Sequence, residues 1–162
     1  MPEPASGAPG AIVLRPGEGR LLPLPFEGSI MVRVPSENTG GAWCQFEYVV
    51  PPRFSGPVPH YHTRIDEHFD VLEGALVFRS GNESVDAGAG SSVFVPRGVV
   101  HAFRNNADTP ARMLVTMSPG GFEDYFIGLG AIIRASPQWP PQDMTALIDL
   151  NARFDTIVVP GK

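Results

Sequence analysis

The stretches HYHTRIDEHFDVLEG at residues 60–74 and GSSVFVPRGVVHAFRN at residues 90–105 decide how this chain is expected to fold. They contain all four histidines of the sequence. Successive side chains on a strand point to opposite faces, so His60 and His62 project to the same side of a strand. Two imidazoles on one side of a strand form a natural pair of ligands for a single metal ion.

A carboxylate and a third imidazole can join this pair. Glu67 begins a segment, 67–74, whose β-branched and aromatic residues predict a second strand, and a hairpin can bring its carboxylate beside both rings. His101 comes from a distant strand, because PRG at 96–98 predicts a tight turn and 99–104 a strand leaving it. Imidazole and carboxylate suit Fe, Mn, Co, Ni, Cu or Zn, and the lack of a nearby thiolate disfavours a structural zinc cage. We expect one divalent transition-metal ion per chain, with His60, His62, Glu67 and His101 as ligands.

These residues resemble the two motifs of the cupin superfamily. The first motif ends H-x-H, three or four residues, Glu, six residues, Gly; the second reads G-x5-P-x-G-x2-H-x3-N. The second is matched at every fixed position, by Gly90, Pro96, Gly98, His101 and Asn105. The first departs in one respect, since the family places a glycine five residues ahead of the paired histidines, whereas three residues separate Gly56 from His60. We interpret this as a shortened loop that leaves the ligand set intact.

The resemblance covers about residues 28–117 and implies an all-β fold, the double-stranded β-helix or jelly roll of the cupin barrel. The four-residue gap before Glu67 and the segment SPGGFEDYF at 118–126 are similar to small single-domain bacterial cupins grouped with quercetin 2,3-dioxygenase. In that group the carboxylate is implied to act both as ligand and as general base, which makes Glu67 the candidate catalytic residue.

Short apolar runs separated by turn residues also predict an antiparallel sandwich or barrel. The expected strands are 28–34, 43–50, 67–74, 75–79, 91–95, 99–104 and 111–117. The Pro-, Gly- and Ala-rich start of the chain is typical of disorder. We therefore expect a disordered N-terminus at 1–10, a β-barrel at 11–118 and a helical extension of the same domain at 119–162.

The pattern changes from strand to helix in this extension. Apolar residues recur at helical spacing in 122–134 and 143–154, with Asp143 as the expected N-cap. Both helices are too short for a core of their own, so we expect them to pack on the barrel or over one mouth. The run TIVV at 156–159 predicts a closing strand that is available to a neighbouring subunit, and we expect a homodimer.

Apolar side chains are expected beside the metal ligands. Phe69 and Val71 share the face of Glu67 by alternation, and Phe103 shares that of His101. They would wall a small substrate pocket, or form ordinary barrel core, and both roles hold at once in a small barrel. At the pocket entrance we expect Phe122, Tyr125 and Phe126, with simple packing as the alternative.

Composition excludes several classes of protein. The net charge is −5 and no basic cluster occurs, so nucleic acid is not an expected partner. No window approaches the roughly 20 apolar residues of a membrane helix, and the N-terminus has no signal-peptide pattern. The single cysteine, Cys44, fits a reducing compartment and a buried packing role, so we expect a soluble cytoplasmic protein. The fourth histidine, His68, should face away from the metal.

Three hypotheses for function follow. In the first, a metal-dependent dioxygenase, an enolic or phenolic substrate binds the metal as its anion, Glu67 accepts the proton, and dioxygen adds to the activated substrate. The second is an oxygen-independent isomerase, epimerase, dehydratase or cyclase that uses the metal as a Lewis acid. The third is a small-molecule binding protein without catalysis. The sequence does not select the metal or the substrate.

Overall fold

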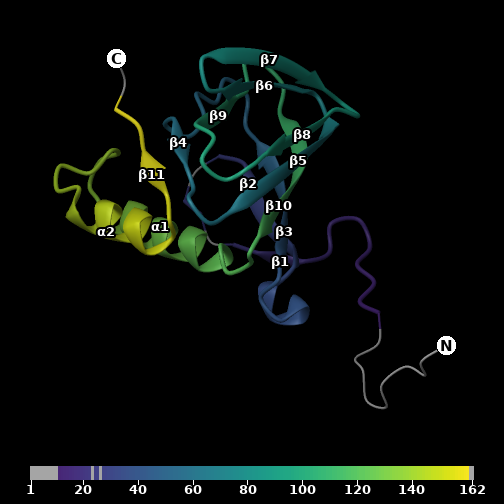
Figure 1. Ribbon diagram of the computed structural model, residues 1–162, viewed down its shortest axis with the longest axis horizontal. Coiled ribbons are helices and arrows are strands. Elements are labelled where there is room, and N and C mark those ends of the chain that lie inside the picture. The colour runs from purple at the N-terminus through teal and green to yellow at the C-terminus, as the bar shows by residue number, and fades with distance from the viewer. Residues whose placement is uncertain (1–10, 23, 26, 161–162) are drawn as a thin grey trace.

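The computed structural model describes residues 11–160 except 23 and 26, so the expected disordered stretch at 1–10 lies outside the described residues. Two antiparallel sheets face each other (Figure 1). The larger sheet has the order β1 (Arg20–Leu21), β2 (Ser29–Val34), β3 (Cys44–Val50), β10 (Ala111–Ser118), β5 (Asp66–Glu73) and β8 (Ser92–Val95). The smaller has the order β11 (Ile157–Val158), β4 (His60–Tyr61), β9 (His101–Arg104), β6 (Ala75–Ser80) and β7 (Glu83–Gly88). The expected all-β double-stranded β-helix is confirmed.

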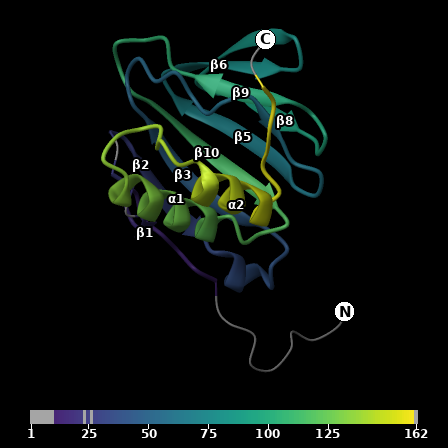
Figure 2. The ribbon, with the colours of Figure 1, turned by 90° about the vertical axis from the view of Figure 1, so that its left-hand side faces the viewer.

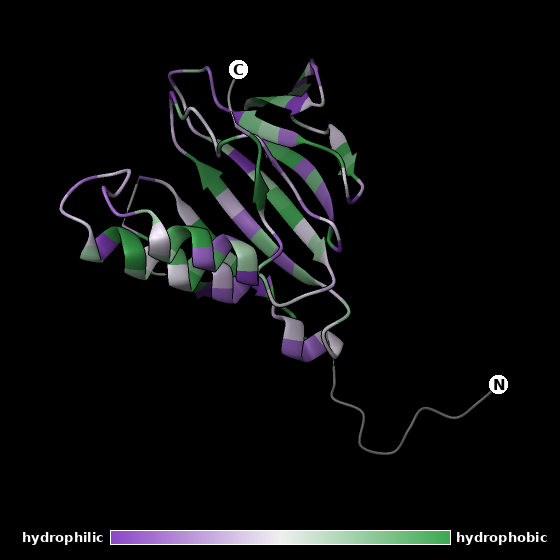
Figure 3. Cartoon of the chain, turned by 60° about the vertical axis from the view of Figure 1, so that its left-hand side comes forward, coloured by the Kyte–Doolittle hydropathy of each residue, from purple (hydrophilic) through white to green (hydrophobic). Residues whose placement is uncertain are grey.

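Alternation along the strands places one face of each sheet in a shared core. Buried residues occupy every second position of β3 and β10, and of most of β5. Hydrophobic and hydrophilic residues accordingly succeed each other along these strands (Figure 3). On β5 the inward side chains include Glu67 and Phe69, and the Phe69 ring lies 5.2 Å from that of Phe78 and 6.2 Å from that of Phe103. The aromatic core of the barrel therefore reaches the carboxylate of the site.

One glycine and one asparagine fix the strand that carries His101. Gly56 has φ of 85°, and a Cβ at this position would lie 1.6 Å from the backbone oxygen of Phe103 on β9. Only a residue without a side chain allows the loop before β4 to approach β9 so closely. Asn105, directly after β9, is buried and hydrogen-bonds to backbone groups on both sides of it. Gly56 and Asn105 therefore hold the backbone around β9 in place.

The helices α1 (Glu123–Ala135) and α2 (Thr145–Arg153) lie side by side, in front of the strands in the view of Figure 2, and the short 3-10 helix η1 (Ser36–Thr39) precedes β3. Gly128 of α1 allows close contact with α2, because a Cβ there would lie 2.7 Å from Leu150. Phe126 packs edge-on against Phe46 of β3, with ring centroids 5.4 Å apart. The helices therefore pack on the barrel, as expected. Neither helix has the length and apolar character that crossing a membrane requires, within the residues described.

Three details differ from expectation. Helix α2 begins one residue later than predicted, with Met144 in the cap position, while Asp143 accepts a hydrogen bond of 2.9 Å from the backbone N–H of Thr145. The closing strand β11 pairs with β4 of the same chain, Ile157 opposite Tyr61, and lies at the edge of its sheet, so its pairing with a neighbouring subunit stays a prediction. The homodimer itself stays a prediction. Strand β7 was not expected, because most of its residues are exposed.

Candidate metal centre

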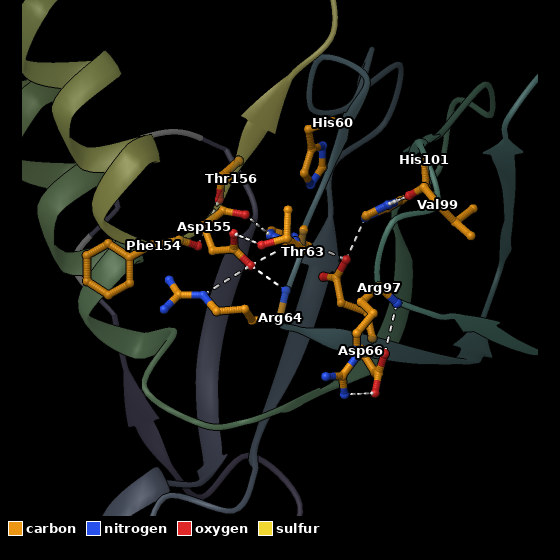
Figure 4. Close-up of polar contacts among 12 residues, drawn as sticks. His60, Thr63, Arg64, Asp66, Arg97, Val99, His101, Phe154, Asp155 and Thr156 are labelled. Atoms are coloured by element: carbon orange, nitrogen blue, oxygen red, sulfur yellow. Dashed lines mark hydrogen bonds and ion pairs between the residues drawn. The ribbon is translucent and has the colours of Figure 1, made fainter.

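The four expected ligands lie close together. His60 and His101 are opposite each other on neighbouring strands β4 and β9, and His62 follows β4 directly. Glu67 reaches the same point from β5, in the opposite sheet. One ligand atom from each residue lies within 4.8 Å of the others. Figure 4 shows the rings of His60 and His101 in this region.

Backbone carbonyls orient all three rings in the same way. The Nδ1 atom of His60 lies 2.9 Å from the oxygen of Val58, and that of His101 lies 3.0 Å from the oxygen of Val99. The Nδ1 atom of His62 lies 2.9 Å from a carbonyl oxygen of the C-terminal segment. A carbonyl can only accept a hydrogen bond, so each ring carries its proton on Nδ1. In a neutral ring Nε2 is then an acceptor, which is the arrangement that metal-binding histidines use.

The Nε2 atoms of His62 and His101 face the carboxylate of Glu67, which is another acceptor, and not a hydrogen-bond donor. Oxygen Oε2 of Glu67 lies 2.5 Å from Nε2 of His101 and 3.4 Å from Nε2 of His62. None of these three buried atoms has a hydrogen-bond partner among the described residues. Converging buried acceptors are unfavourable unless a cation joins them. The donor set therefore fits a transition-metal ion, for which three imidazoles and one carboxylate are suitable ligands.

The protonation tendencies of the cluster agree with this fit. Burial, with a smaller contribution from His101, lowers the pKa of His60 to about 4. Burial alone would raise the pKa of Glu67, but the contacts with His101 and His62 outweigh it and hold this pKa well below its usual range. Burial lowers the pKa of His101, yet the contact with Glu67 raises it above its ordinary value. A neutral imidazole and an ionised carboxylate are the forms that bind metal, and a proton competes with a metal ion for His101 at low pH.

Aromatic side chains enclose the centre on two sides. The Phe69 ring lies 6.4 Å from that of His101, on the core side. The Phe122 ring meets His62 edge-on at 5.6 Å and stacks on Tyr125 at 4.6 Å. The other residues of the expected pocket, Val71, Phe103 and Phe126, are packed in the core or against it. Their role in binding a substrate stays a prediction.

An open cleft of about 240 Å³ adjoins the centre. Arg64, Phe122, Arg153 and Phe154 are among the residues that line it. Phe122 contacts the ring of His62, so the cleft borders the residues that surround the metal ligands. Phe122 was expected at a pocket entrance, whereas Arg64, Arg153 and Phe154 were not, because they come from segments far apart in the sequence.

Three further residues support the site and were not recognised from the sequence. Asp155 is buried and supplies the carbonyl that accepts from His62. Asp66 and Arg97 form a two-point ion pair, with Arg97 Nη2 at 2.6 Å and Nε at 3.1 Å from the carboxylate. This pair ties the start of β5 to the turn before His101. Asp66 and Arg97 lie inside the recognised motifs, whereas nothing in the sequence connects position 155 with position 62.

The positions of His68 and Cys44 agree with the sequence prediction. His68 is partly exposed, and its Nε2 lies 2.6 Å from the hydroxyl of Ser92, away from the cluster. Cys44 is completely buried, and burial raises the pKa of its thiol to about 12. A thiol in this state is a packing group and not a nucleophile.

Comparison with known proteins agrees with this architecture. The model of the Cupin domain family matches residues 46–117. The tetracenomycin polyketide synthase protein TcmJ of Streptomyces glaucescens is 37% identical over 60 residues, which are 37% of this chain and 40% of that protein. Quercetin 2,3-dioxygenase of Aspergillus japonicus is 38% identical over 80 residues, 46% of this chain and 23% of that protein. The chain thus spans less than half the length of either relative.

Among solved structures, the polyketide cyclase RemF of Streptomyces resistomycificus superposes with a TM-score of 0.58. The alignment covers 67% of this chain and 80% of that one, at 19% identity. KdgF of a Halomonas species superposes with a TM-score of 0.59 over 70% of this chain and 96% of that one, at 14% identity. At such identities the likeness shows the fold alone.

Proposed function

We propose that this chain, whose residues 46–117 match the Cupin domain family, is a metal-dependent dioxygenase acting on a small enolic or phenolic, flavonol-like substrate. One observation carries the proposal of a metal site. Three imidazoles, each with Nδ1 on a backbone carbonyl, turn their acceptor nitrogens toward one buried carboxylate. The proposed ligands are His60, His62, Glu67 and His101, and the ion is one of Fe, Mn, Ni, Co, Cu or Zn.

The protein supplies the proton transfer and the surroundings. A divalent ion held by these four residues would supply a Lewis acid that lowers the pKa of an enol or phenol hydroxyl. Glu67 is then the group that accepts the hydroxyl proton, since it is ionised and is the only carboxylate of the cluster. Phe69 and Phe122 limit access of water on the core side and beside His62, which favours chemistry on a charged intermediate.

The use of dioxygen is supported by the similarity to quercetin 2,3-dioxygenase. The test mixes metal-loaded protein with a flavonol or a simpler enolic compound without oxygen and then adds oxygen. Oxygen uptake is expected for the wild type and for His68→Gln, in which an imidazole outside the cluster is removed. Uptake should fall strongly in Glu67→Gln when its metal content is restored. Equal uptake in Glu67→Gln would contradict the role of Glu67 as base.

A second candidate is an oxygen-independent cyclase, isomerase or dehydratase. The similarity to TcmJ, a polyketide synthase protein, favours it. Glu67 would again remove the proton, and the resulting anion would attack within the substrate in place of reacting with dioxygen. Turnover that continues under strict anaerobiosis would establish this second function over the first. Binding of metal and ligand without turnover in either condition would instead support a non-catalytic binding protein.

A further inference from the structure

We infer that Asp155 is a positioning residue of the proposed metal centre and that the C-terminal segment is part of the site. The three imidazole rings differ in the carbonyl that Nδ1 contacts. The partners of His60 and His101 are the carbonyls of Val58 and Val99, each two residues earlier in the chain. The partner of His62 is the carbonyl of Asp155, 93 residues away. Only His62, among these rings, depends on a distant segment for its orientation.

The carboxylate of Asp155 holds that carbonyl in place. It accepts hydrogen bonds from the N–H of Thr63 at 2.8 Å, from the hydroxyl of Thr63 at 2.7 Å and from the N–H of Arg64 at 2.7 Å. Figure 4 shows these contacts converging on Asp155. Its backbone oxygen contacts His62 and its side chain contacts the next two residues. Asp155 therefore contacts three consecutive residues, 62 to 64, through its backbone carbonyl and its carboxylate.

The backbone of Asp155 is itself adapted to this position. Its φ is 54°, in the left-handed region that residues with a side chain rarely adopt. Aspartate tolerates this conformation better than most residues. The turn is completed by a 2.8 Å hydrogen bond from the N–H of Thr156 to the oxygen of Asn151. Strand β11 then runs along β4, with Val158 opposite His60, so the segment continues beside a second ligand.

The consequence for the metal is geometric. When Nδ1 of His62 donates to Asp155, its Nε2 is an acceptor that points toward Glu67, 3.4 Å away. Without this contact the ring is free to turn or to carry its proton on Nε2, and in neither state does it present a lone pair to the ion. Removing such a supporting contact typically lowers metal affinity by about 10–100-fold.

The test compares wild type, Asp155→Ala, Asp155→Asn and a control, Asp149→Ala. Asp149 is an exposed carboxylate on α2 in the same segment. The first measurement is the affinity for Co²⁺, by competition with a chelator. We expect Asp155→Ala to lose about 10–100-fold, Asp155→Asn to lose less because it retains an acceptor oxygen, and Asp149→Ala to match wild type.

The second measurement determines which ring nitrogen of His62 carries the proton in the metal-free protein. Long-range ¹H–¹⁵N spectra distinguish a proton on Nδ1 from one on Nε2. We expect His62 to lose its pure Nδ1–H state in Asp155→Ala, while His60 and His101 keep theirs and serve as internal references. A general loss of structure would change all three rings and lower the unfolding temperature, so it is distinguishable from the proposed effect. If Asp155→Ala does not fold, the same comparison is made on Asp155→Asn.

The inference depends on the proposed metal site, but the two can fail separately. If wild type binds no Co²⁺, the metal function fails and the tautomer of His62 alone decides the role of Asp155. If wild type binds Co²⁺ and the folded Asp155 variants match it both in affinity and in the His62 spectrum, the positioning role is overturned.

Discussion

Replacing Asn105 with alanine should destabilise the protein by about 3 kcal/mol. The Asn105 side chain is 1% exposed, so water cannot replace the contacts that it makes. Its Nδ2 donates to the oxygens of Pro51 at 3.0 Å and Thr109 at 2.9 Å, and its Oδ1 accepts from the N–H of Ala107 at 3.0 Å. Each bond contributes about 1 kcal/mol, and its loss leaves a buried backbone group without a partner.

This loss corresponds to a fall in the unfolding temperature of about 6–12 °C for a domain of this size. The measurement is thermal unfolding followed by circular dichroism. The neighbouring Asn106→Ala is the matched control, because Asn106 is exposed and its replacement should change the midpoint by less than about 2 °C. A midpoint of Asn105→Ala within 2 °C of this control would show that these three bonds do not hold the turn between β9 and β10.

Three further predictions address the metal, the loop before β4 and pH. Saturation with metal at about 100 times its dissociation constant should stabilise the protein by about 2.7 kcal/mol, and chelation should reverse this; a melting temperature that responds to neither contradicts the site. Gly56→Ala should lower the free energy of unfolding by at least about 2 kcal/mol, because its Cβ would meet the backbone of Phe103. Gly40 has a φ of 62° but open space around it, so Gly40→Ala should show only the cost of the backbone conformation. Equal losses of stability in urea unfolding would exclude the steric effect. Burial raises the pKa of Asp155, but hydrogen bonds from its neighbours outweigh burial and leave this pKa below the ordinary 3.8. The contribution of Asp155 to stability is therefore complete above pH 3.8 and is lost as the pH falls through the lower pKa of the folded state. Unfolding midpoints measured between pH 6 and 2 should fall less in Asp155→Asn than in wild type, and parallel curves would contradict the assignment.

Residue spacing was sufficient to predict the barrel and the cluster of four side chains. The alternation that makes Glu67 and Phe69 share a face of β5 is a property of any strand, and it holds in the structure. The turn at 96–98 and the strand after it were expected, and the structure places His101 on that strand, opposite His60. In both cases local rules act over a few residues, so the prediction did not require knowledge of distant contacts.

What could not be predicted depends on distant backbone contacts. The contact from His62 to Asp155 uses a carbonyl, which every residue has, so no residue type reveals it. Strand β7 escaped recognition because it lies at a sheet edge with only Ala87 buried, and a hydrophobic pattern is absent there. The pairing of β11 with β4 was missed for the same reason, since two exposed residues carry no signal for their partner.

The most direct test of the metal centre is the metal content of the purified protein by elemental analysis. The comparison uses wild type, the double variant His60→Ala/His62→Ala, and His68→Ala, in which a histidine outside the cluster is removed. We expect about one transition-metal ion per chain in wild type and in His68→Ala, and a loss of that ion in the double variant. A wild-type protein that contains no metal and takes up none from iron, manganese, nickel, cobalt, copper or zinc would contradict this expectation.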